Sequence, residues 1–417
     1  MTLTRRFAAP SPREGEVIYQ RVMFQLPGAL DSSHNDSMLS IRRRIVLATA
    51  TALFAFLGPL RLASSPLLIP LELPKQLSDE AFWKMVTEFS EPGGYFRSDN
   101  FVSNETTFQY VLKSLKNTRP GGVYLGVGPD QNFTYIVAIK PRMAVIFDIR
   151  RQNILQHLMY KALIEMSSDR ADFVSKLFSR NRPENLGAAT TADGLFAAYD
   201  GVAPNRQLFL KNLQAIKSRL EEHHKFKLSA DDETSIEYVY NSFYEGGPDL
   251  TYNGVGGRGF GRRMPTYAEI MEMTDEEGVN RSYMGTEENF KILQEFENRN
   301  LIVPIVGDFA GPKAIRAVAA YLKQHDAFVS AFYVSNVEQY LFQQGDDWSK
   351  FYSNVESLPV DPTSAFIRSV FNGMSLTYQP SGFGLRSASL LSSIPDVVKG
   401  FTSGEVRTYY DIINMSK

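Results

Sequence analysis

The sequence predicts an α/β protein with a doubly wound, mostly parallel sheet, a long and largely helical insertion, and an N-terminal signal or anchor segment. Short apolar runs alternate with segments of helical periodicity at 120–166, and the alternation resumes over 301–417. Such alternation is typical of parallel strands that helices cover on both faces. A charged, mostly helical stretch at 167–300 separates the two parts and predicts the insertion.

Composition excludes several classes of protein. The 417 residues are 43% hydrophobic and 22% charged, as in ordinary globular domains, and this excludes wholesale disorder. A formal charge of -2 gives no overall attraction to nucleic acid, so we expect no nucleic-acid partner. The absence of cysteine excludes disulfides, thiolate metal sites and cysteine nucleophiles. His223 and His224, in the polar run EEHHK, predict a solvated helix end rather than a metal site, and we expect no metal.

The N-terminus predicts a targeting segment. Residues 1–37 form a polar leader, or an over-extended start ahead of a true start at Met38. Residues 38–66 have the layout of an export signal, with three arginines before the apolar run 45–60. That run is shorter than the ~20 residues of a comfortable membrane span. Three interpretations of residues 38–66 therefore stay open: a cleaved signal, a short membrane tether through 45–60, or a buried helix. The first two place the body on the periplasmic side, and the third leaves it in the cytoplasm.

Residues 67–119 predict a linker and N-terminal helices. Three prolines stiffen the linker, and we expect the folded body to begin near Leu77. Ser78 is the expected N-cap of a first helix. Apolar residues at helical spacing predict a second helix over 104–117.

The first alternating part, 120–166, predicts two strands and two helices. The expected strands are 123–129, which leads into a glycine turn, and 143–149. A short helix at 131–139 and an amphipathic helix at 151–166 follow them. In the second part we expect strands at 301–309, 327–336 and 364–371 and helices at 311–325 and 337–344.

The first two strands carry the strongest functional pattern. The first ends in Gly126-Val127-Gly128, and the second ends in Asp148, 22 positions after Gly126. Glycines at such a turn let a ligand approach the backbone closely, next to an electropositive helix N-terminus. An acid about 20 residues on is placed to accept hydrogen bonds from a ribose diol. The third glycine of the full dinucleotide fingerprint is absent.

Residues 120–375 resemble a class I S-adenosylmethionine-dependent methyltransferase domain, a Rossmann-like superfamily. VYLGVGPDQN is similar to its first motif, AVIFDI to its acidic second motif, IVGDF to its third and FYVSNVEQYL to its fourth. The resemblance implies S-adenosylmethionine as cofactor and methyl transfer to an unknown acceptor. The positions that it assigns are Gly126 and Gly128 along the methionine portion, Asp148 at the ribose, Asp308 near adenine, and Asn336 with Tyr340 at the reacting methyl group.

Each of these residues also has a structural interpretation. The glycines suit any tight strand-to-helix turn, and Asp148 is placed to pair with a following arginine. Asp308 is placed to cap the helix that begins near Pro312, and Asn336 the helix after it. Their joint occurrence at strand ends, where open sheets bind ligands, favours the functional interpretation.

The stretch Gly254–Gly261, with Arg258, Arg262 and Arg263 in or beside it, has three interpretations: a flexible insertion, a lid whose arginines engage an anionic substrate, or a nucleic-acid contact.

The leading function is therefore methyl transfer, which needs positioning and desolvation more than a catalytic base. An export signal conflicts with a cofactor that is made and kept in the cytoplasm. The alternative is an exported or membrane-anchored small-ligand-binding protein that reuses the fold without methyl transfer. Hydride transfer is a third hypothesis, which the missing glycine disfavours.

Overall fold

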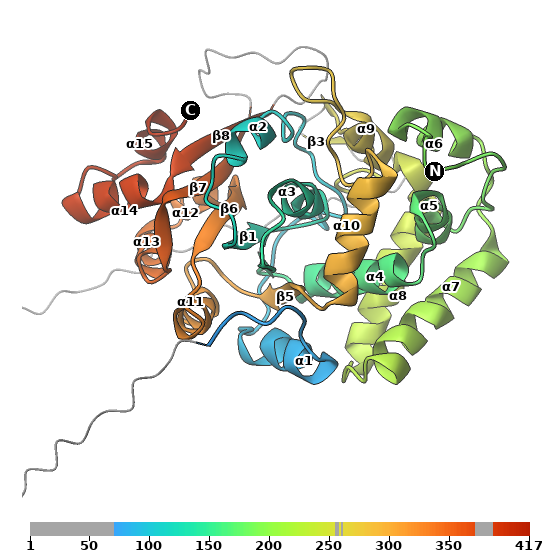
Figure 1. Cartoon of the computed structure of the whole chain (residues 1–417), viewed down its shortest axis with the longest axis horizontal. Helices are drawn as coiled ribbons and strands as arrows, with labels where there is room; N and C mark the ends of the chain where they lie inside the picture. Colours follow the sequence, from blue (N-terminus) through green and yellow to red (C-terminus); the bar gives the residue numbers. More distant parts are fainter. Residues whose placement is uncertain (1–70, 255–257, 260–261, 372–386) are drawn as a thin grey trace, which may run out of the picture. The chain divides into compact units, whose positions relative to one another are not determined.

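The structure is a computed structural model, and it describes residues 71–254, 258–259, 262–371 and 387–417 (Figure 1). The predicted leader and the predicted signal or anchor lie outside the described residues. Within the described ranges, no helix has the length and apolar character needed to cross a membrane. Both alternating parts and the insertion belong to one unit, Leu68–Lys417.

Six strands form one mostly parallel sheet in the order β5-β2-β1-β6-β7-β8. Five of them are parallel to one another, and β8 pairs antiparallel with β7. The mixed α/β class with a mostly parallel sheet is confirmed. The strands are β1 (Val123–Val127), β2 (Met143–Asp148), β5 (Ile302–Val306), β6 (Val329–Ser335), β7 (Val360–Phe371) and β8 (Ser387–Ser393).

Helices connect the parallel strands, and all of them except α13 lie at the predicted places. The connecting helices are α3 (Gln131–Ile139), α4 (Arg151–Glu165), α11 (Ala314–Gln324), α12 (Val337–Leu341) and α13 (Asp347–Glu356), followed after β8 by α14 (Ile394–Ser403) and α15 (Tyr409–Asn414). The strands β1 and β2 in the sheet interior and β5 at its edge are buried throughout, as their continuous apolar runs predict. The strand β8 was not predicted, because its sequence SASLLSS is serine-rich and lies at the sheet edge.

The N-terminal region contains one confirmed helix and one wrong prediction. The first helix, α1 (Asp79–Glu88), begins after Ser78, whose Oγ accepts the Ala81 N–H at 3.1 Å. The second prediction was wrong over most of its length, since only α2 (Leu112–Leu115) is helical. The polar groups before α2 bond to the sheet instead: the Thr106 N–H donates to the Ser387 Oγ of β8 at 2.8 Å.

The insertion is mostly helical, as expected. Its elements are α5 (Arg170–Phe178), α6 (Ala192–Tyr199), α7 (Arg206–Ser218), the π-helix η1 (Arg219–His223), α8 (Ala230–Gly246), the 3-10 helix η2 (Gly247–Asp249), β3 (Arg258–Gly259), β4 (Arg262–Arg263), α9 (Tyr267–Glu272) and α10 (Glu287–Asn298). The short strands β3 and β4 pair antiparallel within the glycine-rich stretch. The rest of that stretch after Gly254 lies outside the described residues, so its lid and nucleic-acid interpretations stay predictions.

The prediction that α4 is amphipathic was wrong. Twelve consecutive residues of α4, from Asn153 to Ile164, are buried. The cause is the insertion, because its helices α5, α8 and α10 pack on α4 and cover the side that the polar residues would otherwise present to water (Figure 1). The polar side chains of α4 from Asn153 to Lys161 are therefore interior groups.

The solvated helix end predicted at the two histidines is confirmed for His223, which is exposed at the end of η1, and was wrong for His224. His224 follows η1 and is 6% exposed. Its Nδ1 lies 2.8 Å from Oδ1 of Asp79 in α1, and its Nε2 lies 2.7 Å from Oε2 of Glu165 in α4. His224 thus lies between two carboxylates from distant parts of the chain.

Candidate functional site

The carboxyl ends of β1, β2 and β6 meet at one edge of the sheet, because the three strands are parallel neighbours. Gly128 follows β1, Asp148 ends β2 and Asn336 follows β6. The strand order also reverses between β1 and β6, since β2 and β5 lie on one side and β7 and β8 on the other. Ligands of open α/β sheets bind at such a point.

The glycine turn is fixed by its own contacts. A side chain on Gly126 would lie 1.9 Å from Oδ1 of Asn132, so this position has room only for glycine. Gly128 has a φ of +77°, which L residues rarely adopt. The Asn132 amide donates to the carbonyls of Val127 and Pro129 at 3.0 and 2.6 Å. These bonds hold the turn against α3.

Asp148 is buried and paired with Arg150. Oδ1 of Asp148 accepts the Arg150 backbone N–H at 2.8 Å and Nε at 3.1 Å, while Oδ2 accepts the guanidinium at 3.0 Å. The guanidinium also donates to the Ser98 carbonyl at 2.8 Å. The structural interpretation of Asp148, an ion pair with a following arginine, is therefore present in the structure.

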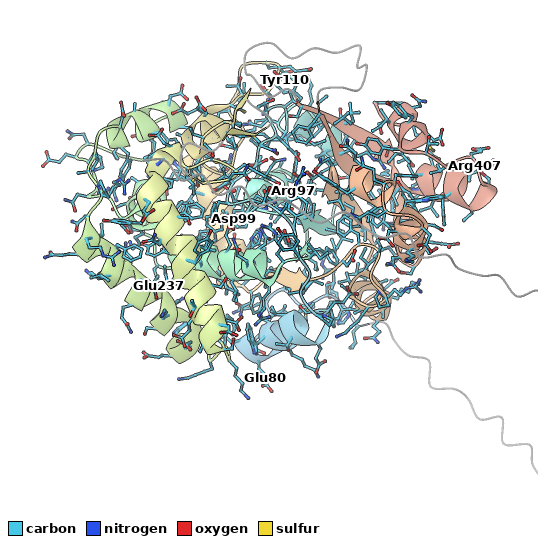
Figure 2. The ribbon with its side chains drawn as sticks, turned by 180° about the vertical axis from the view of Figure 1, so that it is seen from behind. Glu80, Arg97, Asp99, Tyr110, Glu237 and Arg407 are labelled. Carbon is cyan, nitrogen blue, oxygen red and sulfur yellow. The ribbon has the colours of Figure 1, made fainter. Side chains whose placement is uncertain are left out.

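A segment before the first strand covers this edge. We call Phe96–Thr107 the covering segment. It passes the end of β2 at Ser98 and the end of β1 at Asn100, which is the nearest group to a side chain at Gly128, 3.5 Å away. Asp99, labelled in Figure 2, accepts from Gln152 of α4 and Tyr238 of α8, both at 3.3 Å.

The covering segment places a buried carboxylate at the end of β6. Glu105 is 1% exposed. It accepts hydrogen bonds from the Tyr333 hydroxyl at 2.7 Å, the Ser335 Oγ at 2.5 Å and the Gln131 amide at 2.7 Å. Ser335 has a φ of +49°, an unusual conformation for a residue other than glycine, directly before Asn336. Glu105 thus joins β6 to the start of α3.

Tyr340 lies near the Asp148 pair, and Asn336 begins the same helix. The Tyr340 ring packs edge-on against Phe96 of the covering segment, with centroids 5.8 Å apart. Burial raises the pKa of Tyr252 to about 12, and the nearby Tyr340 raises it further while Arg150 lowers it. Tyr252 therefore lies within electrostatic range of Tyr340 and of Arg150. Asn336 is at the N-cap position of α12, and among the described residues its side chain makes no capping bond.

Asp308 has other neighbours. It follows the edge strand β5, and its Oδ1 accepts the Ala310 N–H at 2.9 Å. Burial raises the pKa of its carboxyl group. The interpretation of Asp308 as the cap of α11 was wrong, since Glu91 accepts the first N–H groups of that helix, from Lys313 and Ala314. Among the described residues, no hydrogen bond or ion pair joins the Asp308 side chain to the Asp148–Arg150 pair.

His157 connects the glycine turn to the interior. Its Nε2 lies 2.8 Å from the Gly128 carbonyl oxygen, and the ring is 2% exposed. Burial lowers the pKa of His157 to about 4, against smaller raising effects of the Gly128 carbonyl and Asp148. The imidazole is therefore neutral at neutral pH, and its Nε2 carries the proton that it donates to the carbonyl.

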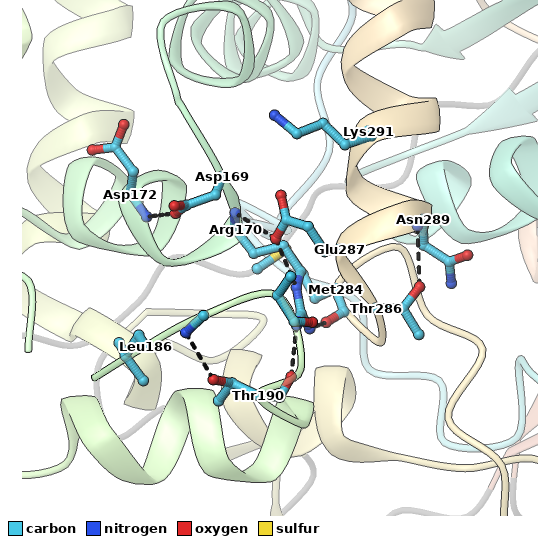
Figure 3. A network of polar contacts seen from close by, with 12 residues as sticks. Asp169, Arg170, Asp172, Leu186, Thr190, Met284, Thr286, Glu287, Asn289 and Lys291 are labelled. Carbon is cyan, nitrogen blue, oxygen red and sulfur yellow. Dashed lines mark hydrogen bonds and ion pairs between the residues drawn. The ribbon is translucent and has the colours of Figure 1, made fainter. Parts of the chain in front are cut away.

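A second polar cluster lies in the insertion (Figure 3). The Arg170 guanidinium donates to the carbonyls of Met284 and Thr190, both at 2.6 Å, and pairs with Glu287 at 3.3 Å. Arg170 is 2% exposed. These contacts join α5, the loop before α6 and the start of α10, so the cluster stabilises the insertion.

Sequence reasoning missed Glu105, Gln131, Tyr252 and His157. Glu105 fell within the predicted second helix, and His157 within a helix thought to face water. The signal that marks His157 is a run of polar residues at helical spacing within a helix that follows a buried strand. Over the described part of the chain, no three histidine, aspartate or glutamate side chains are grouped to hold a metal ion.

Comparison with protein families gives a match over most of the chain. The family described as "Domain of unknown function (DUF7790)" matches residues 100–389, which include β1 to β7, most of the covering segment and the whole insertion. No curated protein matches the chain. The match extends over more than half of the chain, so the protein belongs to the DUF7790 family.

Proposed function

We propose that this domain binds S-adenosylmethionine at the carboxyl edge of β1, β2 and β6 and transfers its methyl group to an acceptor. One observation carries the proposal. A glycine turn with positive φ at Gly128 and an acid at Asp148 end two adjacent parallel strands, beside the point where the strand order reverses. This is the arrangement in which open sheets bind nucleoside ligands.

The strand order supports a doubly wound, Rossmann-like fold. The chain moves outward from β1 to β2 and β5, returns to β6, and then moves the other way to β7. Crossovers between parallel strands are almost always right-handed. Right-handed connections in opposite directions place α3 and α4 on one face of the sheet and α11 and α13 on the other.

The residues at the edge fit the cofactor with one rearrangement. A carboxylate offers about four acceptor positions, and Arg150 occupies three of those on Asp148. A ribose diol donates two hydrogen bonds, so Arg150 has to release at least one of its contacts. Its carbonyl partner Ser98 is in the covering segment, and we therefore expect cofactor binding to move that segment.

The chemistry needs little from the protein beyond positioning. When bound, S-adenosylmethionine supplies an electrophilic methyl group on a positively charged sulfur. Asn336 and Tyr340 lie on the β6 side of the edge, where they are placed to orient the acceptor. The ring of Tyr340 and its partner Phe96 exclude water from that side.

Calorimetric titration of S-adenosylmethionine and S-adenosylhomocysteine into the full chain tests the proposal. We expect saturable binding of both by the wild type and its loss in Gly128→Ala, where a side chain is strained and faces Asn100. Gly404→Ala is the matched control, because Gly404 has a φ of +78° at the end of α14, away from this edge. The control carries the same backbone strain and should bind like the wild type.

The Asp148–Arg150 pair favours a second candidate, a small-ligand-binding protein that reuses the fold without methyl transfer. Asp148 is buried and already paired with Arg150, as expected of an acid that stabilises the fold rather than binds a ligand. Absence of binding of either molecule by a folded wild type would overturn the methyltransferase proposal and favour this candidate. The exported or anchored form of the candidate concerns residues 38–66, outside the described residues.

A further inference from the structure

Residues 92–100 cross the carboxyl edge of the sheet between two fixed points. At the first, the Glu91 N–H donates to the Val306 carbonyl of β5 at 2.9 Å, and the Glu91 carboxylate accepts N–H groups at the start of α11. At the second, Phe101 is 2% exposed, and its carbonyl oxygen accepts the Gln156 amide of α4 at 2.6 Å. The chain between these points is therefore anchored at both ends.

The chain between the two anchors is loosely packed. None of residues 92–100 is buried, and Tyr95 is 85% exposed, whereas residues 101–103 are all buried. Permissive backbone positions lie next to both anchors. Gly93-Gly94 lies next to the first, and Asn100, next to the second, has a φ of +55°, in the left-handed region that asparagine adopts more readily than most residues. Few buried groups and permissive ends are the properties of a segment that opens locally.

The Arg150 guanidinium holds this chain over the edge. It donates to the carbonyls of Ser98, at 2.8 Å, and of Asp99, and it lies over the Phe96 ring, 5.9 Å from the ring centre. The same guanidinium is the counterion of Asp148. A ligand that binds the Asp148 carboxylate therefore competes for the group that keeps the chain in place.

We propose that residues 92–100 form a gate over the carboxyl edge, which Arg150 holds closed. The hinges of the gate are Gly93-Gly94 and Asn100. Opening of the gate admits a ligand to Asp148, and a ligand at Asp148 draws Arg150 away from the gate. The gate regulates entry to the site of the proposed function and in that respect rests on it. Opening is a property of the ligand-free chain, so it is measured without S-adenosylmethionine.

Contacts of the Asp99 side chain also hold the gate, and they do not involve Asp148. Its carboxylate accepts from Gln152 and from Tyr238, both at 3.3 Å, which is long for hydrogen bonds. Asp99→Ala removes both contacts and leaves the Arg150 bonds to the backbone carbonyls and the Asp148 pair in place. We expect this variant to open the gate more often at a nearly unchanged melting temperature, because weak, partly exposed contacts contribute little to folding.

Two adjacent glycines give a matched pair of variants. A Cβ on Gly94 would lie 2.7 Å from Cδ1 of Ile149, so alanine fits the closed position only if Ile149 shifts. A Cβ on Gly93 would meet its nearest atoms, in Arg151, at 3.8 Å, which is ordinary contact. Gly94→Ala should therefore favour the open gate, and Gly93→Ala should behave like the wild type.

The chain contains no cysteine, so one introduced thiol at a time reports opening by its rate of reaction with a bulky maleimide. Tyr95→Cys is exposed and should react fastest, and Ser103→Cys, at a position 5% exposed beyond the second hinge, should react slowest. Ser98→Cys, partly buried within the gate, should react at a rate between the two. Asp99→Ala and Gly94→Ala should each raise the rate at position 98 several-fold and leave that at position 103 unchanged. A rate at position 98 equal to either reference would overturn the gate, because that position would then be always closed or always open.

A disulfide tests whether ligand entry needs the opening. Cβ atoms at positions 93 and 151 would be 3.8 Å apart, the usual separation in a disulfide. In the double variant Gly93→Cys/Arg151→Cys, oxidation pins the first hinge to α4, and S-adenosylmethionine should then bind at least tenfold more weakly than to the reduced chain. Arg151→Cys alone is the matched control, because it also loses the ion pair with Asp232 but has no second thiol. Binding by this control should not depend on oxidation.

The outcomes separate the gate from the proposed function. Equal affinity of the oxidised and the reduced double variant would overturn the role of the gate in ligand entry. Absence of binding by the wild type would instead overturn the proposed function. The labelling rates would still decide whether the gate exists, because they are measured on the ligand-free chain.

Discussion

The carboxylate of Asp148 and the guanidinium of Arg150 form a buried ion pair at the end of β2, with Oδ2 and the guanidinium nitrogen 3.0 Å apart. Their side chains are 6% and 8% exposed. Because the same guanidinium donates to the Ser98 carbonyl, the pair links the sheet to the covering segment. Loss of the pair should therefore lower the stability of the fold as well as the affinity for any ligand at this edge.

Asp148→Asn should lower the free energy of unfolding by about 3 kcal/mol, because it leaves the Arg150 charge buried without its counterion. Urea denaturation at neutral pH measures this. Asp396→Asn on the exposed surface of α14 makes the same chemical change and should stay within about 0.5 kcal/mol of the wild type. Equal stability of the two variants would mean that the pair contributes nothing to folding.

His157 predicts a loss of stability on mild acidification. Its folded pKa of about 4, lowered by burial, lies below the ~6.5 of an unfolded histidine. The stabilisation is fully present above pH ~6.5 and is lost as the pH falls towards 4. Over that window it amounts to about 3 kcal/mol.

Asp130 opposes this trend in the wild type, because its folded pKa is raised and acidification favours its folded state. The difference between wild type and His157→Gln isolates the histidine. We expect the stability advantage of the wild type over the variant to shrink by about 3 kcal/mol between pH 7.5 and 4. A constant difference across that range would contradict the prediction.

A second buried pair joins β7 to α12. Arg368 and Glu338 are 0% and 1% exposed, and their atoms approach to 2.5 and 3.1 Å. Either Arg368→Met or Glu338→Gln should cost about 3 to 5 kcal/mol, since each leaves polar partners buried and unpaired. The double variant should cost clearly less than the sum of the two. A double-mutant cycle by urea denaturation measures this coupling, and simple additivity would refute it.

The sequence predicted the strands better than the segments between them. Three of the parallel strands, β1, β2 and β5, are short apolar runs that are buried throughout, and this apolar character is a local property of the sequence. The second helix failed because the Thr106 N–H bonds to Ser387, 281 positions away. The helical periodicity at 104–117 is a local pattern and does not indicate a hydrogen bond to Ser387.

The sequence also predicted only part of the candidate site, because local patterns are visible in it and distant partners are not. Gly128 and Asp148 are recognisable because they end apolar runs. Glu105 and His224 are not, since their burial depends on groups from distant elements, such as Tyr333 for Glu105 and Glu165 for His224. From the sequence alone, a polar side chain is predicted to be exposed, because its tertiary partners are not visible there.

Glu91 acts as a carboxylate cap supplied from outside the helix that it stabilises. Oε1 accepts the N–H groups of Lys313 and Ala314 at 2.6 and 2.8 Å, and Oε2 accepts that of Asp308 at 3.1 Å. The bonds hold the loop after β5 to the start of α11, where a negative charge also opposes the helix dipole.

Glu91→Ala should therefore lower the free energy of unfolding by about 2 kcal/mol, and Glu91→Gln, which keeps one acceptor oxygen, by about half as much. Glu88→Ala is the control, because Glu88 is 61% exposed and its closest basic group, on Lys84, is 4.0 Å away. That control should change stability by less than about 0.5 kcal/mol. Equal losses at positions 88 and 91 would show that the three N–H groups find water instead, and that Glu91 does not fix the loop that carries Asp308.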